Sequence, residues 1–164
     1  MENIKNMEVK NIRIAKYSVQ LVKEENKTYQ VPKDIEKLMI SSCNIVADVV
    51  NRIFKLDCQT DEHFVMLALD TKNRIVGSFT ITIGTINSSL VNTRGIFQRA
   101  LLCNASKIIL AHNHPSGVVE PSRDDINVTR NIDKCGELLG IELLDHIIIG
   151  ENGDYTSLKA RGDF

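Results

Sequence analysis

Three short runs of apolar residues most constrain what this chain can fold into. The runs are HFVMLALD (63–70), SKIILAH (106–112) and ELLDHIIIG (142–150). Continuous apolar runs of this length are typical of strands buried within a sheet. Segments with the helical spacing of apolar residues lie before and between them, at 41–54, 93–104 and 122–140. This order predicts a mixed α/β fold in which helices flank one sheet.

Turn signals divide the rest of the chain. RIAKYSVQLV and YQV, on either side of the polar turn KEENK, predict a hairpin within residues 13–31. IVGSFTITIG (75–84) follows the first apolar run after a polar turn and predicts a second, antiparallel hairpin. Thr93 is the expected cap of its helix, and Ser122 and Gly140 bound the last long helix. We predict an N-terminal extension, 1–57, made of a hairpin and a helix and packed on a domain at 58–164.

Composition excludes several classes of function. With 164 residues, 20 basic and 21 acidic side chains and a net charge of -1, the chain fits one domain without strong binding to nucleic acid or to an anionic membrane. No apolar run is long enough to span a bilayer, and the N-terminus has no secretory pattern. The four cysteines form no C-x-x-C pair and fit a reducing compartment. We therefore expect a cytoplasmic protein, and the sequence leaves a homodimer open.

A histidine pair marks the end of the second apolar run, in the stretch AHNHPSG. His112 and His114 are two residues apart, so on a strand their side chains point to the same face. Ser122 then begins the last long helix, and Asp125 falls in its first turn. Two histidines and one aspartate supply three zinc ligands and leave a fourth position for water, as in catalytic zinc sites.

Other interpretations of these residues stay open at this point. Ser122-x-x-Asp125 also fits a capping box, and the two histidines alone fit polar residues at a strand exit. Two histidines and a carboxylate also form the facial triad of non-heme Fe(II) enzymes, although the β-rich architecture usual for such oxygenases is not evident. The combination of three ligand types around one loop favours the metal site.

The pattern H-x-H-x7-S-x-x-D resembles the JAMM motif of MPN-domain metalloproteases. AHNHPSG, PSRDD, LLGIELLDHIIIG, LDTKNRIVG and GTINSSLV more narrowly resemble its RadC-like bacterial branch, over residues 62–158. The resemblance implies an α/β fold of the MPN/JAMM, cytidine-deaminase-like type, a mixed sheet flanked by helices. It also implies one Zn²⁺ held by His112, His114 and Asp125, with Ser122 holding the substrate or stabilising the oxyanion. The activity it implies is zinc-dependent hydrolysis of peptide or isopeptide bonds in a peptide or protein substrate.

Two departures from the family pattern bear on function. Because the residues before Glu62 are predicted to form a hairpin and one helix, we do not expect among them the helix-hairpin-helix region that RadC-like chains often carry and that is associated with DNA. The family's Pro-Arg-Glu is Thr93-Arg94-Gly95 in this chain. A non-proteolytic factor associated with DNA repair remains the alternative function.

The general base is the remaining catalytic role. The resemblance places a glutamate at the start of an early strand, which is the position of Glu62; a solvated acid at a strand end is the other interpretation. Glu120 and Asp124 lie nearer to the ligands in sequence. Asn113 and Ser116 are candidate donors to substrate. Asp145 and His146 are adjacent on the last strand, so they face opposite sides, and one of them is expected to be a buried polar group with a partner. A supporting role beside the zinc ligands is the other interpretation of this pair.

Overall fold

The computed structural model describes residues 42–84 and 91–164. The hairpin predicted within 13–31 lies outside these residues. The strands are β1 (His63–Leu69), β2 (Ile75–Ile83), β3 (Lys107–Asn113), β4 (Glu142–Ile149) and β5 (Tyr155–Ser157). The helices are α1 (Cys43–Phe54), the short 3-10 helix η2 (Leu56–Cys58), α2 (Thr93–Leu102), α3 (Arg123–Leu139) and α4 (Leu158–Arg161).

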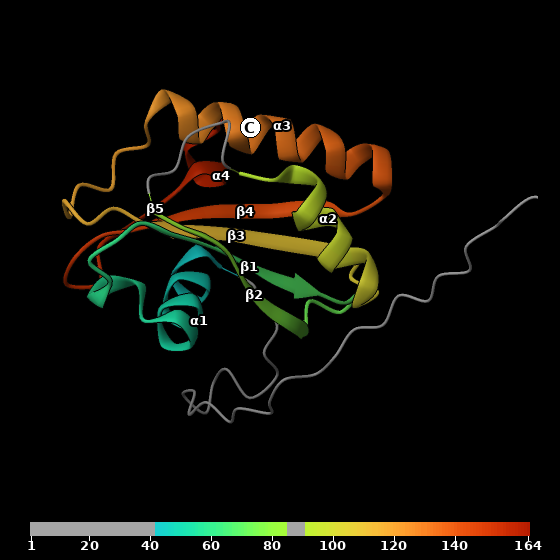
Figure 1. Cartoon of the computed structure of the whole chain (residues 1–164), viewed down its shortest axis with the longest axis horizontal. Helices are drawn as coiled ribbons and strands as arrows, with labels where there is room; N and C mark the ends of the chain where they lie inside the picture. The colour runs from blue at the N-terminus through green and yellow to red at the C-terminus, as the bar shows by residue number, and fades with distance from the viewer. Residues whose placement is uncertain (1–41, 85–90) are drawn as a thin grey trace, which may run out of the picture.

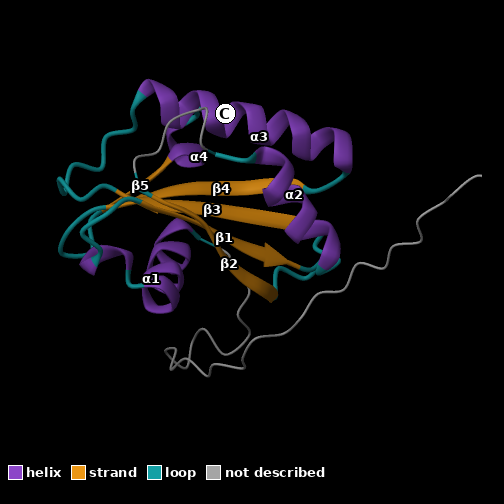
Figure 2. Cartoon of the chain, viewed as in Figure 1, coloured by secondary structure: helices purple, strands orange, loops and turns teal. Residues whose placement is uncertain are grey.

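The strands form one mixed sheet in the order β2-β1-β3-β4-β5. β1 pairs antiparallel with both β2 and β3, β3 pairs parallel with β4, and β5 is antiparallel to β4. Helix α1 lies on one side of the sheet, and α2, α3 and α4 lie on the other (Figure 1). Figure 2 shows the sheet enclosed between these two groups of helices. The predicted mixed α/β fold with flanking helices is therefore confirmed.

The apolar runs are continuous because both faces of the central strands are covered. Alternate residues of β1 enter two separate cores. Phe64, Met66 and Ala68 pack under α2 and α3. Val65, Leu67 and Leu69 pack against α1. The edge strand β2 alternates between partly buried and exposed residues instead, so only the interior strands required unbroken apolar sequence.

Most of the predicted elements are found where the sequence places them. The hairpin of 63–84 forms, and α3 begins after its cap Ser122 and ends before Gly140, which has φ 68°. The predicted cap of α2 was wrong. Asn92, not Thr93, occupies the cap, because its Oδ1 accepts a hydrogen bond from the Gly95 N–H at 3.0 Å.

None of the helices described within residues 42–84 and 91–164 combines the length and the apolarity needed to cross a membrane. Helix α1, which lies within the predicted extension, packs its buried valines into the core shared with β1, β3 and β4. The division of the chain at 57/58 stays a prediction.

Candidate metal centre

The carboxyl end of β3 presents the two histidines. His112 is fully buried on the α2–α3 side of the sheet, two residues beyond Leu110. His114 follows the last strand residue, and its backbone N–H donates to the carbonyl of Ile149 at 3.0 Å. The His114 carbonyl in turn accepts from the Gly117 N–H at 2.9 Å, which closes a turn. Both rings therefore lie on one face, as the spacing of two predicts.

The first turn of α3 supplies the carboxylate. The Ser122 Oγ accepts from the Asp125 N–H at 3.1 Å, and Asp125 Oδ2 accepts from the Ser122 N–H at 2.7 Å. The capping box is thus present. It does not exclude the metal site, because the same carboxylate also faces both histidines. Asp125 is buried, with its side chain only 5% exposed.

The three side chains converge on one point. His112 Nε2 lies 3.0 Å from His114 Nε2 and 3.3 Å from Asp125 Oδ1, and His114 Nε2 lies 3.5 Å from Asp125 Oδ2. Tetrahedral Zn²⁺ with bonds of about 2.0–2.1 Å separates its ligand atoms by about 3.3 Å. The set therefore fits a metal ion in both spacing and donor chemistry. Within the described residues, it is the one group of three or more such side chains that meets this geometry.

The His114 ring is oriented by the loop that follows it. Its Nδ1 lies 2.6 Å from the backbone carbonyl oxygen of Val118. A carbonyl can only accept, so Nδ1 carries a proton, and in the neutral ring Nε2 keeps its lone pair for the cluster. The loop packs closely against Gly150. A side chain at that position would clash with the loop, because its Cβ would lie 2.7 Å from the Gly117 carbonyl oxygen.

The His112 ring is held from behind by other buried side chains. Its Nδ1 lies 2.9 Å from His146 Nε2, and His146 Nδ1 lies 2.6 Å from the Thr129 hydroxyl. Phe64 stacks against the His112 ring, with 6.0 Å between centroids and 15° between planes. The same phenyl ring meets His146 edge-on at 5.3 Å. His146 thus has the partner expected for a buried polar group, and that partner is a residue of the cluster.

Burial and charge set the protonation of the cluster. Burial lowers the pKa of His112 to about 4 and lowers the pKa of His146 well below its usual range. A hydrogen bond with Asp125 is the main cause of a raised pKa at His114. Burial opposes ionisation of Asp125, but interactions with His114, His112 and Ser122 together outweigh it and hold the carboxyl pKa below its usual range. At neutral pH, His112 and Asp125 are therefore in the forms that bind metal.

Glu62 stands immediately before β1, whose interior position next to β3 agrees with the prediction. Its backbone carbonyl accepts from the Gly84 N–H at 2.8 Å. After the hydrogen bond with Asp125, the charge of Glu62 is a further contribution to the raised pKa of His114. The Glu62 carboxylate is thus within electrostatic reach of the more exposed side of the cluster, where the His114 side chain is 15% exposed.

Asn113 holds the segment that carries Glu62, a role different from the predicted contact with substrate. Its side chain points to the opposite face from His112 and is almost fully buried. Asn113 Oδ1 accepts from the His63 N–H at 2.7 Å, and Nδ2 donates to the carbonyls of Asp61 at 3.0 Å and Gln59 at 3.4 Å. Because all three contacts are to backbone, the amide fixes the course of the chain on either side of Glu62.

The rival acids lie in other surroundings. Glu120 forms a two-pronged ion pair with Arg161, with both N–O distances at 3.1 Å. Asp124 is exposed in the first turn of α3. Ser116 accepts a long hydrogen bond, 3.4 Å, from the Val118 N–H. Ser122 is exposed and caps α3; its predicted contact with substrate stays a prediction.

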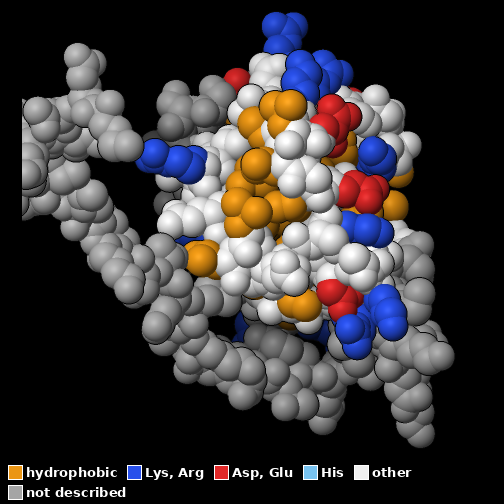
Figure 3. All heavy atoms as spheres, turned by 90° about the vertical axis from the view of Figure 1, so that its right-hand side faces the viewer, with side chains coloured by type: hydrophobic (Ala, Val, Ile, Leu, Met, Phe, Trp, Pro, Cys, Tyr) orange, Lys and Arg blue, Asp and Glu red, His pale blue; other side chains and the backbone are white. Residues whose placement is uncertain are grey.

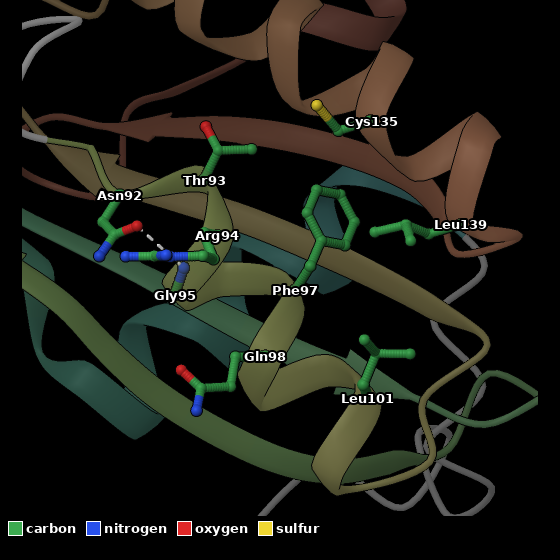
Figure 4. Close-up of a pocket in the computed structure, with 9 residues that line it drawn as sticks. All are labelled: Asn92, Thr93, Arg94, Gly95, Phe97, Gln98, Leu101, Cys135 and Leu139. Atoms are coloured by element: carbon green, nitrogen blue, oxygen red, sulfur yellow. Dashed lines mark hydrogen bonds between the residues drawn. The ribbon is translucent and has the colours of Figure 1, made fainter. Parts of the chain in front are cut away.

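A hollow lies between α2 and α3, and none of the cluster residues lines it. Figure 4 shows Phe97, Leu101 and Leu139 pointing into it, with Thr93, Arg94 and Gly95 at its other end. A band of hydrophobic side chains covers the face on which the C-terminal ends of α2 and α3 meet (Figure 3). Leu101 is 57% exposed and Leu139 47% exposed. The position at which the chain departs from the family's Pro-Arg-Glu therefore lines this hollow.

Comparison with known proteins agrees with the geometry. A family model described as a RadC-like JAB domain matches residues 40–163. The chain is similar to a UPF0758 protein of Clostridium kluyveri, with 54% identity over 101 residues that cover 62% of this chain and 44% of that protein. It is also similar to the UPF0758 protein YsxA of Bacillus subtilis, with 50% identity over 103 residues, 63% of this chain and 44% of YsxA.

The longest of these matches is to the UPF0758 protein CPE2144 of Clostridium perfringens, 42% identical over 156 residues that cover 94% of this chain and 67% of the relative. The chain matches less than half the length of the first two relatives. The family match confirms the resemblance drawn from the motifs, and it includes every residue of the cluster.

Proposed function

Because this chain belongs to the RadC-like JAB domain family, we propose that it is a zinc-dependent metallopeptidase that hydrolyses peptide or isopeptide bonds. The convergence of His112, His114 and Asp125 carries the proposal. Their ligand atoms all lie within 4.8 Å of one another, where the end of β3 meets the first turn of α3. Three protein ligands with one partly exposed side are the pattern of catalytic rather than structural zinc sites.

A metal ion bound by these three residues would supply a polarised water with its pKa lowered to about 7. Glu62 then acts as general acid–base. Its carboxylate takes a proton from the attacking water and delivers it to the nitrogen of the leaving amine as the carbon–nitrogen bond breaks. The products are a carboxylate and an amine. The Asn113 contacts to Asp61 and His63 hold the backbone on either side of Glu62.

We propose that Ser122 assists catalysis on the α3 side. Its oxygen accepts from the Asp125 N–H, and it lies exposed at the cap of the helix that brings Asp125 to the cluster. A hydroxyl at a helix N-terminus is suited to stabilise an oxyanion, because the helix dipole favours negative charge there. We assign it to the carbonyl oxygen of the scissile bond.

The test begins with the metal. Protein purified aerobically without added metal should contain one zinc per chain, and a fluorogenic peptide and isopeptide library should show cleavage that a chelator abolishes and zinc restores. Iron in the site together with oxygen uptake would instead favour the facial-triad enzyme. Zinc-loaded protein that cleaves no member of either library would contradict the peptidase assignment.

A further inference from the structure

A row of buried polar groups runs from His112 away from the cluster and ends on α3. His112 Nδ1 contacts His146 Nε2 at 2.9 Å, and His146 Nδ1 contacts Thr129 Oγ1 at 2.6 Å. The Thr129 hydroxyl in turn donates to the backbone carbonyl of Asp125 at 2.6 Å. His112, His146 and Thr129 are each fully buried. The row thus begins at one residue of the cluster and ends at another.

The chemistry of these groups fixes the direction of every hydrogen bond. A hydroxyl has one proton, and the Thr129 proton is used on the Asp125 carbonyl, which can only accept. The Thr129 oxygen must therefore accept from His146 Nδ1–H. A neutral imidazole carries one N–H, so His146 Nε2 is a lone pair and accepts from His112 Nδ1–H. His112 is left with its free lone pair on Nε2.

That lone pair is the one that faces His114 and Asp125, at 3.0 and 3.3 Å. If the row ran in the opposite direction, the proton of His112 would lie on Nε2 and would occupy the position of a metal. The direction is decided at Thr129, which is four residues after Asp125 and so on the same face of α3. One turn of α3 therefore supplies both the carboxylate and the carbonyl that anchors the row.

We propose that Thr129 and His146 are positioning residues that hold His112 as its Nδ1–H tautomer, with the Nε2 lone pair directed to the metal. The proposal rests on the metal site of the proposed function and assigns it two residues outside the ligand set. A hydrogen bond on the second nitrogen of a metal-binding histidine fixes its orientation and tautomer, and loss of such a partner typically lowers metal affinity about 10- to 100-fold. For His114, the carbonyl of Val118 provides this bond; for His112, the row of side chains does.

Thr129→Val tests the row with little change in volume, because it replaces the hydroxyl by a methyl group. His146 Nδ1–H then loses its acceptor, and nothing selects one tautomer of His112. We expect zinc affinity, measured by competition with a chromophoric chelator, to fall about 10- to 100-fold. Thr129→Ser keeps the hydroxyl and should restore affinity to within about threefold of the wild type. Thr82→Val is the matched control, because its buried hydroxyl has no hydrogen-bond partner among the described residues.

The tautomer itself is measured on metal-free protein with ¹⁵N-labelled histidine, by long-range ¹H–¹⁵N correlation. Wild type and Thr129→Ser should show His112 protonated on Nδ1, and Thr129→Val should show both tautomers or the other one. Wild-type His112 protonated on Nε2 would overturn the proposal, as would unchanged zinc affinity in Thr129→Val. The spectrum needs neither metal nor substrate, so it tests the row even if the chain proves not to be a peptidase. If Thr129→Val does not fold, the wild-type spectrum alone decides whether His112 is protonated on Nδ1.

Discussion

His112 and Asn113 are neighbours on β3, yet their side chains enter opposite faces of the sheet and meet different surroundings. On the α3 face, His112 joins a row of polar side chains that ends on Asp125. On the α1 face, Asn113 lies beside an aliphatic core, and its hydrogen bonds all go to backbone. At this end of β3, other side chains hold His112, whereas Asn113 fixes the course of the neighbouring backbone.

The carboxyl end of β3 therefore has two tasks: one face orients the metal ligands, and the other fixes the segment that precedes β1. The α3 face sets which atoms point at the metal, so changes there should alter metal binding more than folding. The α1 face sets where the segment before β1 runs, so changes there should alter stability and the placement of Glu62 while the metal is kept. Each prediction below tests one side of this division.

Removal of a ligand should have the largest effect. In His114→Ala, we expect stoichiometric zinc binding to be lost, because two protein ligands remain and the open side of the site is widened. The fold should persist, since His114 lies beyond the end of β3 and contributes little to either core. Metal analysis after dialysis and the far-ultraviolet circular dichroism spectrum give the two readouts. His63→Ala, which removes a histidine outside the cluster, is the control; full zinc occupancy in His114→Ala would contradict the ligand assignment.

The general base should come next. In Glu62→Gln, we expect zinc to be retained and turnover of a peptide or isopeptide substrate to fall about 10²- to 10⁴-fold, the usual contribution of a positioned acid–base group. Glu120→Gln is the matched control, because that carboxylate is paired with Arg161. An active Glu62→Gln beside an inactive Glu120→Gln or Asp124→Asn would place the base elsewhere.

The ligand set could be predicted from sequence because each part depends on local geometry. A spacing of two puts His112 and His114 on one face of any strand, and Ser122 as a cap puts Asp125 in the first turn of any helix. The order of strands and helices then brings the carboxyl end of β3 and the first turn of α3 together. The cap of α2 was missed for a local reason, since both Asn92 and Thr93 are residue types that cap.

A supporting role for Asp145 or His146 could be named from the sequence, but the partners of the supporting residues could not, because their contacts depend on how distant segments align. His146 meets His112 only because β4 pairs parallel to β3 with Leu110 opposite His146. Asn113 contacts 59–63 across some fifty positions of sequence, and nothing near it in the chain indicates that partner. For Thr129, the signal was present in its spacing of four from Asp125, but a threonine in mid-helix is too common to single out.

Acid should lower the unfolding free energy of the metal-free protein through the buried rings of His112 and His146. Because burial lowers the pKa of His112 to about 4 and that of His146 well below 6.5, the unfolded chain binds protons at both positions before the folded chain does. The raised pKa of His114 gives stability that is fully present below about pH 6.5 and is lost as the pH rises through its folded pKa. Asp125, whose pKa is lowered, keeps its contribution until the pH falls below about 3.8.

The net expectation is a loss of about 2 to 4 kcal/mol in unfolding free energy between about pH 6.5 and 4.5, from urea titrations in the presence of a chelator. His146→Phe should flatten this dependence, because it removes one of the two groups that take up protons on unfolding. A wild-type stability that is constant over this range would show that the two rings are not buried as neutral groups.

Replacement of Asn113 should have the smallest effect, and it should lower stability rather than zinc affinity. In Asn113→Ala, the His63 N–H and the Asp61 carbonyl each lose a partner inside the protein, so we expect unfolding free energy to fall by about 1 to 3 kcal/mol. Zinc affinity should stay within about threefold of the wild type, because no ligand and no member of the His146–Thr129 row is touched. Turnover should fall, because the backbone around Glu62 is held less firmly. The loss should be smaller than in Glu62→Gln, since the carboxylate is still present. Gln59→Ala is the matched control, because its side chain donates to the Phe54 carbonyl rather than to β3. If Asn113→Ala instead released zinc while Thr129→Val retained it, the division of tasks between the two faces would be reversed.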